Sequence, residues 1–97
     1  MPVYRLEPID DFLKEQSWQH TLLSIPCWVE AGDEDQARQQ VALLTAVHPT
    51  DPESVRHSPW LSPVLTMCIE EMPQFALEPM ITVRVDGVLQ SWTRATG

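Results

Sequence analysis

The side chains best suited to nucleophilic chemistry in this chain are two cysteines, Cys27 and Cys68. The histidines that could serve them as bases are His20, His48 and His57. Each cysteine lies inside an apolar, strand-like stretch, and burial there raises the pKa of a thiol and makes it inert. The two are not in C-x-x-C spacing, and a disulfide would require adjacent strands. We therefore expect free, buried thiols and no cysteine-based catalysis.

Paired carboxylates are a second source of chemistry, and two acidic pairs occur: Asp10 with Asp11, and Glu70 with Glu71. Neighbouring residues on a strand point to opposite faces of the sheet. Such a pair is therefore a poor start for acid–base catalysis, which needs two groups converging on one substrate.

A metal or phosphate site is not indicated either. The loop from His48 to His57 also contains Asp51 and Glu53, but their spacing matches no specific set of zinc ligands. The chain has three glycines and no G-x-G-x-x-G, Walker, G-x-S-x-G or H-E-x-x-H motif. The sequence predicts no cofactor and no metal, and it favours a non-enzymatic protein.

The four tryptophans are more informative, because they are many for 97 residues. Tryptophan is enriched both in cores and at the energetic centres of protein interfaces. Alternation along the chain puts Trp28 on the strand face that a helix would not cover, so not all four rings fit one core. The candidate partner-binding residues are Leu22, Trp28, Trp60 and Trp92.

The formal charge of −8, from six basic and fourteen acidic residues, bears on the kind of partner. An excess of acid repels phosphate backbones, so a nucleic-acid ligand is not expected. The acids are scattered, and those at Asp33–Asp35 suit the positive end of a helix. No apolar run reaches the roughly 18 residues of a membrane span, and the first residues do not resemble a secretory signal. We expect a cytoplasmic protein that binds no membrane.

The stretch that organises the fold runs from Leu22 to His48. Residues 22–31 alternate as in a half-buried strand, and Pro26 within them favours an edge position or a bulge. Asp33 and Gln36 then form a capping-box-like start for a helix that ends near His48. The helix face expected to pack on the sheet consists of Ala37, Val41, Leu44 and Val47.

Further strands are predicted on both sides of this unit. Residues 3–8 form a first strand, 64–72 a third strand placed centrally because both its faces are apolar, and 81–92 a hairpin around Asp86-Gly87. Residues 10–18 are weakly helical or a loop. The proline-rich segment 48–63 is a loop that Trp60 and Leu61 fold back onto the body. The prediction is one α+β domain over 1–97, β-β-α-β-β, with a mainly antiparallel four- to five-stranded sheet and one principal helix on one face.

Two motifs in this framework form a recognisable pattern. Ala31-x-x-Glu34-x-x-Ala37-Arg38 opens the helix, and Ser58-Pro59-Trp60-x-x-Pro63 follows in the loop. Together they resemble a group of small bacterial proteins that share these motifs over roughly residues 3–70. The resemblance implies no activity, ligand or catalytic residue.

The sequence thus favours a protein-interaction or assembly module that binds a protein partner or itself. Self-association is expected through the second strand, at its edge and at the face that carries Leu22 and Trp28. The alternative is an acidic inhibitor that occupies a basic, nucleic-acid-binding site on another protein. A third class is an enzyme or ligand binder that uses the proline-rich loop 48–63.

Overall fold

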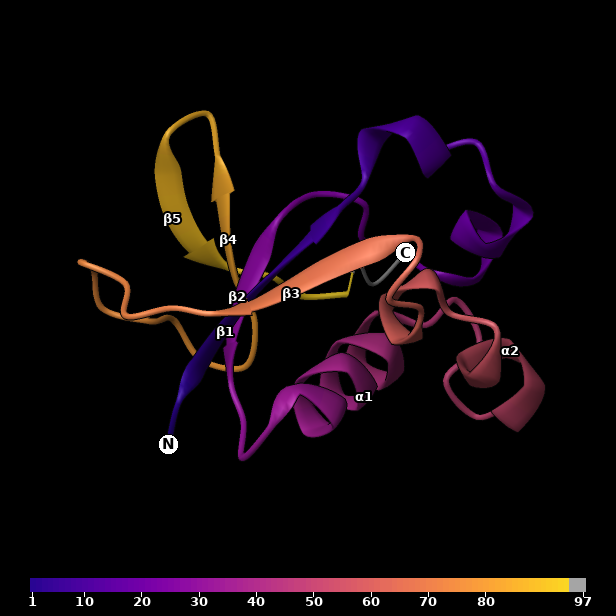
Figure 1. Cartoon of the computed structure of the whole chain (residues 1–97), viewed down its shortest axis with the longest axis horizontal. Coiled ribbons are helices and arrows are strands. Elements are labelled where there is room, and N and C mark those ends of the chain that lie inside the picture. Colours follow the sequence, from indigo (N-terminus) through magenta and orange to yellow (C-terminus); the bar gives the residue numbers. More distant parts are fainter. Residues whose placement is uncertain (95–97) are drawn as a thin grey trace.

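The computed structural model of the protein describes residues 1–94. A five-stranded antiparallel sheet carries one main helix on one face, so the predicted α+β class is confirmed (Figure 1). The strands lie in the order β3-β1-β2-β4-β5. Their bounds, with those of the helix, are β1 Val3–Pro8, β2 Cys27–Glu30, α1 Glu34–Thr45, β3 Thr66–Glu70, β4 Thr82–Val85 and β5 Val88–Ser91. Single turns occupy η1 Asp10–Phe12, η2 Gln16–His20, α2 Pro52–Arg56 and η3 Pro59–Leu61.

The start of α1 is the one that the sequence predicts. The Asp33 carboxylate accepts a hydrogen bond from Gln36 N at 2.8 Å, and Gln36 Oε1 accepts one from Gly32 N at 2.9 Å. These two bonds satisfy backbone donors that the first turn leaves free. The helix ends at Thr45 and not near His48, because Leu22 N donates to Thr45 O at 2.7 Å and draws the chain out of the helix.

The predicted helix face does pack on the sheet. Ala37 and Val41 are fully buried, while Leu44 and Val47 are half-buried. Tyr4 and Leu6 meet this face from β1, with Arg5 and Glu7 on the other side of the strand, as the alternation predicts.

The predicted edge position of the second strand is wrong. The strand covers only Cys27–Glu30 and lies between β1 and β4. Pro26 comes just before it, so its missing N–H removes no bond from the ladder. The residues preceding the strand still contribute to the core through Leu23, whereas Ile25 is exposed.

The predicted central position of the third strand is also wrong. β3 pairs only with β1 and forms one edge of the sheet. Its two apolar faces do not both enter a core: Cys68 faces the helix side, while Met67 and Ile69 are exposed on the opposite side. Two apolar strand faces therefore indicate a central position only where layers cover both faces of the sheet.

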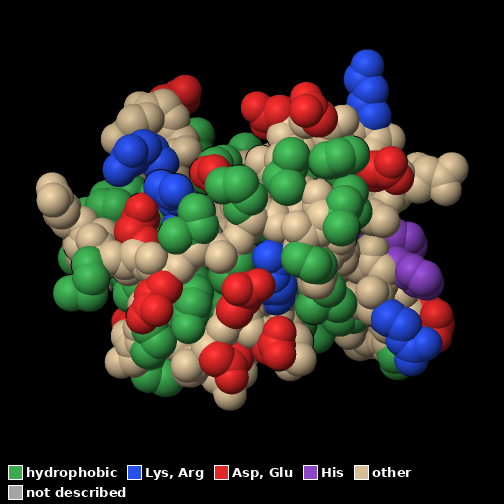
Figure 2. Space-filling view, viewed as in Figure 1, with side chains coloured by type: hydrophobic (Ala, Val, Ile, Leu, Met, Phe, Trp, Pro, Cys, Tyr) green, Lys and Arg blue, Asp and Glu red, His purple; other side chains and the backbone are tan. Residues whose placement is uncertain are grey.

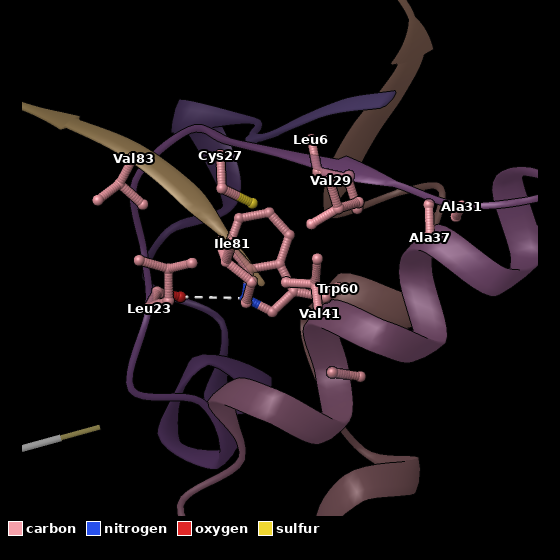
Figure 3. Packing of buried hydrophobic residues seen from close by; sticks show 11 residues of the cluster. Leu6, Leu23, Cys27, Val29, Ala31, Ala37, Val41, Trp60, Ile81 and Val83 are labelled. Carbon is pink, nitrogen blue, oxygen red and sulfur yellow. Dashed lines mark hydrogen bonds between the residues drawn. The ribbon is translucent and has the colours of Figure 1, made fainter. Parts of the chain in front are cut away.

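The proline-rich segment 48–63 is more regular than predicted, since it contains α2 and η3. Pro52 and Pro59 each begin a turn, where a missing N–H costs nothing, and Asp51 and Ser58 cap those turns. The expectation that this segment folds back onto the body is confirmed, because Trp60 is 0% exposed in the centre of the core (Figure 3).

The Trp60 ring is fixed by polar as well as apolar contacts. Its Nε1 donates to Leu23 O and to Thr21 Oγ1, both at 3.1 Å, and the first bond is dashed in Figure 3. Trp18 packs edge-on against the ring at 5.6 Å between centroids. Trp60 therefore joins the segment before β2 to the loop after α1.

Arg38 holds the same loop from the helix side. Although charged, it is buried, and its guanidinium donates to Trp60 O, Ser62 O and Thr66 Oγ1 at 3.1, 3.1 and 2.7 Å. Glu34 faces it at 3.0 Å. The motif at the start of the helix and the motif in the loop therefore meet at this arginine.

The hairpin forms as predicted. Asp86 and Gly87 take φ values of 52° and 79°, as a tight two-residue turn requires. Val85 pairs with Val88, and Trp92 N donates to Ile81 O at 2.8 Å. The hairpin projects from the sheet away from α1, which packs chiefly on β1, β2 and β3 (Figure 1). Over residues 1–94, no helix has the length and apolar character needed to cross a membrane.

Candidate interaction surface

The structure separates the four sequence-predicted partner-binding residues. Trp28 lies on the sheet face opposite α1, Trp60 lies in the core, and Leu22 and Trp92 lie together beneath the projecting hairpin. Each location determines what the side chain can offer to a partner.

Trp28 is covered by the chain itself and is only 8% exposed. The Phe75 ring packs edge-on against it at 5.1 Å, and the Arg84 guanidinium lies 5.7 Å from the ring centroid. The indole Nε1 donates to Glu71 Oε2 at 2.7 Å, and Arg5 Nη1 donates to Glu71 Oε1 at 3.0 Å. We call these five residues the Trp28 cluster.

The cover over Trp28 comes from within the chain. Neither the segment 10–18 nor a second subunit is needed, because Phe75 from the stretch between β3 and β4 packs on the ring. The chain itself therefore covers the Trp28 ring and bonds its N–H, although the buried Arg5 Nε has no hydrogen-bond partner among residues 1–94. Trp60, fully buried, likewise has no surface to offer to a partner in this fold.

Trp92 is different, because its ring is only half-buried and borders two grooves. The first groove, of about 410 Å³, runs between the segment 22–25 and the inner side of the hairpin. Its walls are Leu22, Leu23, Ser24, Ile25, Val83, Val85, Gln90, Ser91, Trp92 and Thr93. The second, of about 440 Å³, lies at the C-terminal end of α1, with Leu43, Leu44, Pro49, Met80, Ile81, Trp92, Thr93 and Arg94 as its walls.

Exposed apolar side chains gather around these grooves. Of the thirteen large hydrophobic side chains exposed among residues 1–94, six lie here. With Trp92 they form what we call the Trp92 surface: Leu22, Ile25, Leu43, Met80, Val85, Val88 and Trp92. Met80 has a φ of +67°, a strained conformation for a residue with a side chain, and it stands at the rim of the second groove.

The first groove is also distinguished by its charge. None of its walls is an Asp, Glu, Lys or Arg. The second groove includes Arg94, and three further hollows of about 290 to 380 Å³ include Arg or Glu side chains. In a chain of net charge −8, a groove without a charged wall is a local exception.

The indole N–H groups show the same contrast. Trp18 Nε1 donates to Phe12 O at 3.0 Å, and the N–H groups of Trp28 and Trp60 also have acceptors. Within residues 1–94, no acceptor faces Trp92 Nε1. An indole at an interface commonly contributes its ring to apolar contacts and its N–H to a polar one.

The groups considered for chemistry are separated in the fold. Cys27 and Cys68 flank Leu6 on the two strands beside β1, so they are not adjacent, and both are free thiols. Burial raises the pKa of Cys27 well above its usual range and that of Cys68, which is only half-buried, to about 11. The part of the chain that the structure describes contains no group of three His, Cys, Asp or Glu residues placed to hold a metal ion.

Comparison of the chain with protein-family models, with curated proteins and with solved structures finds no match. The candidate site therefore depends on the geometry alone. Sequence reasoning identified Leu22 and Trp92 by residue type but missed the other walls of the grooves. No short pattern indicates them, because uncharged runs such as Val88 to Thr93 occur elsewhere in the chain.

Proposed function

We propose that the protein is a non-enzymatic interaction module that binds a protein through the Trp92 surface. The observation that carries this proposal is the pair of grooves beside Trp92, the first without a charged wall and the second mainly apolar, which the only long helix among residues 1–94 leaves open. Exposed apolar patches of this kind mark docking sites in water-soluble proteins.

The surface also has the arrangement of an interface. Its centre offers a tryptophan with large apolar neighbours, and its margin offers uncharged polar groups at Ser24, Gln90, Ser91 and Thr93. Protein interfaces combine a central aromatic anchor with a polar rim in this way, and the central anchor contributes most of the binding energy.

The alternative function, an acidic inhibitor of a nucleic-acid-binding protein, depends on the net charge of −8. Figure 2 shows the acidic side chains distributed over several elements of the face in view, among basic and apolar ones. A mimic of nucleic acid would use a continuous acidic stripe, and its binding would weaken steeply with added salt. Binding through the Trp92 surface depends little on salt.

The test uses matched glutamate substitutions. Val88 on the Trp92 surface is 61% exposed, and Val64, in the loop before β3, is 63% exposed. The tagged wild-type chain, Val88→Glu and Val64→Glu are each used to capture binding proteins at low and high salt. We expect a protein that the wild type and Val64→Glu retain at both salt concentrations and that Val88→Glu loses. Equal capture by both variants would contradict the proposed site.

A further inference from the structure

The outer edge of the hairpin presents unpaired backbone groups. Trp92 N donates to Ile81 O, and bonding to the neighbouring strand alternates along an antiparallel ladder. Val88, Gln90 and Trp92 therefore face β4 with their backbone groups, whereas Leu89 and Ser91 direct theirs away from the sheet. With β5 at the end of the strand order, the two outward pairs of N–H and C=O are open to another strand.

This edge lacks the features that usually prevent an edge strand from pairing with a strand of another chain. Natural edge strands carry lysine, proline, a bulge or an inward-pointing charge. Residues 88–93 read Val-Leu-Gln-Ser-Trp-Thr and contain none of these residue types. The opposite edge of the sheet, β3, has its outward backbone groups at Cys68 and Glu70, so that edge includes a charged residue.

Charge restricts which surface can meet a second copy of the chain. Each copy carries −8, so an interface between two copies must avoid opposing carboxylates. The edge of β5 and the groove next to it meet this condition, because neither contains an acidic side chain. The nearest charges along the chain are of opposite sign, with Asp86 before the strand and Arg94 after it. Antiparallel pairing brings those opposite ends together.

We propose that the partner of the Trp92 surface is a second copy of this chain, joined by antiparallel pairing of β5 with β5 about a two-fold axis at Gln90. The proposal rests on the proposed function and names the partner of that same site. It replaces the self-association through the second strand that the sequence suggests, because β2 is central and Trp28 is covered.

The register follows from the outward groups. Leu89 exchanges two hydrogen bonds with Ser91 of the partner subunit, and the two-fold axis repeats that pair, so four bonds form. Val88 then lies opposite Trp92 of the partner subunit in a pair without backbone bonds, where side chains approach most closely. The two sheets join into one, and the first grooves of both copies meet beside the axis.

The first test is the mass in solution by light scattering at tens of micromolar. We expect a dimer for the wild type and for Val64→Glu, and a monomer for Val88→Glu, whose carboxylate lies against the indole of the partner subunit. The dissociation constant of Val88→Glu should rise roughly tenfold or more, as for a charge placed at the centre of an interface. A monomeric wild type, or a Val88→Glu that dimerises like Val64→Glu, overturns the proposal.

The second test fixes the register by disulfide cross-linking. Gln90→Cys places two thiols at the axis, so mild oxidation should give a covalent dimer. Leu89→Cys, which projects to the other face opposite Ser91 of the partner subunit, should remain a single chain, as should the wild type with Cys27 and Cys68. Preferential cross-linking of Leu89→Cys, or none in either variant, overturns the proposed pairing.

These results separate the identity of the partner from the function of the surface. If the wild type is a monomer but Val88→Glu still loses a captured protein that Val64→Glu retains, the Trp92 surface binds a different protein and only the self-pairing is wrong. If the dimer forms as described, the interaction module is confirmed together with its partner.

Discussion

Trp28 and Trp92 lie on opposite faces of the same sheet and differ in how much of their bonding the chain itself supplies. Trp28 has a carboxylate for its N–H, an aromatic edge against its ring and a guanidinium beside it. Both rings border two hollows, but Trp92 is only half-buried and its Nε1 makes no hydrogen bond within residues 1–94. Both are tryptophans near exposed positions of one acidic domain, yet only the second leaves bonding capacity for a partner.

The difference teaches that residue type alone does not identify an interface. Leaving a tryptophan ring in water is unfavourable, because its burial removes roughly 150–250 Å² of surface from water. Phe75 packs on the Trp28 ring and Glu71 accepts a hydrogen bond from its N–H, whereas Trp60 is enclosed in the core. Trp92, whose ring the chain leaves partly uncovered, is the tryptophan that indicates binding.

The largest expected effect comes from removing the tryptophan that the chain covers. Trp28→Ala should lower the free energy of unfolding by about 3–5 kcal/mol, the usual cost of deleting a buried ring. Self-association should be unchanged in the folded fraction. Urea unfolding followed by far-UV circular dichroism measures the first, and light scattering measures the second. A folded Trp28→Ala that is monomeric where the wild type dimerises would reverse the comparison.

Trp92→Ala should show the complementary pattern. Because the ring is only half-buried, the free energy of unfolding of the monomer should fall by only about 1–2 kcal/mol. Dimerisation should be lost, since the residue is the central anchor of the surface. Light scattering and urea unfolding at low concentration check both parts. Retention of the dimer would assign the interface to another part of the molecule.

Asp33→Ala separates stability from association, because Asp33 caps α1 far from β5. Removing the bond to Gln36 N should cost about 1 kcal/mol. The dissociation constant of the dimer should not change. If this variant also dissociates the dimer, then loss of association in other variants reflects lower stability and not a lost contact.

Glu71→Gln tests whether the Trp28 cluster is held by its hydrogen bond or by its charge. The amide oxygen keeps an acceptor for the indole N–H, but the ion pair with Arg5 is lost. Both partners are about a third exposed, so the expected loss in unfolding free energy is only about 0.5–1 kcal/mol. A loss as large as that of Trp28→Ala would show that the charge is the main stabilising element.

The Cys68 thiol tests the β3 edge of the sheet through the pH dependence of stability and through its labelling rate. The unfolded thiol ionises near pH 8.5, whereas burial keeps the folded thiol protonated up to about pH 11. The contribution of Cys68 to the free energy of unfolding is therefore complete below pH 8.5 and falls as pH rises from there towards 11.

Labelling of native Cys68 should be slow at neutral pH, faster than that of buried Cys27, and independent of protein concentration. Slower labelling at higher concentration would place the interface at β3.

The parts of the fold predicted from the sequence are those encoded within a few residues. Asp33 with Gln36 determines the start of α1, and Asp86-Gly87 determines the hairpin and its register. Strand order depends on partners far along the chain. Pro26 therefore suggested an edge position for a strand that is central, and the apolar run 64–72 suggested a central position for a strand that is at the edge. Local patterns show which face of a strand is apolar but not which layer covers it.

The candidate site was predictable only in part for the same reason. Leu22 and Trp92 could be identified as large apolar residues in strand-like segments. To predict that they converge, one must know that the hairpin extends beyond α1, and no short sequence pattern indicates this. Arg38 was missed because a helical arginine usually faces water, and here five of its hydrogen bonds depend on where residues 34 and 60–66 fold.

Amide hydrogen exchange at the two sheet edges tests the central claim most directly. The N–H groups of Leu89 and Ser91 face outward from β5, and those of Cys68 and Glu70 face outward from β3. As the protein concentration rises from low to hundreds of micromolar, exchange at Leu89 and Ser91 should slow severalfold. Exchange at Cys68 and Glu70 should not change. Concentration-independent exchange at Leu89 and Ser91, or slowing at the β3 edge instead, would contradict the account.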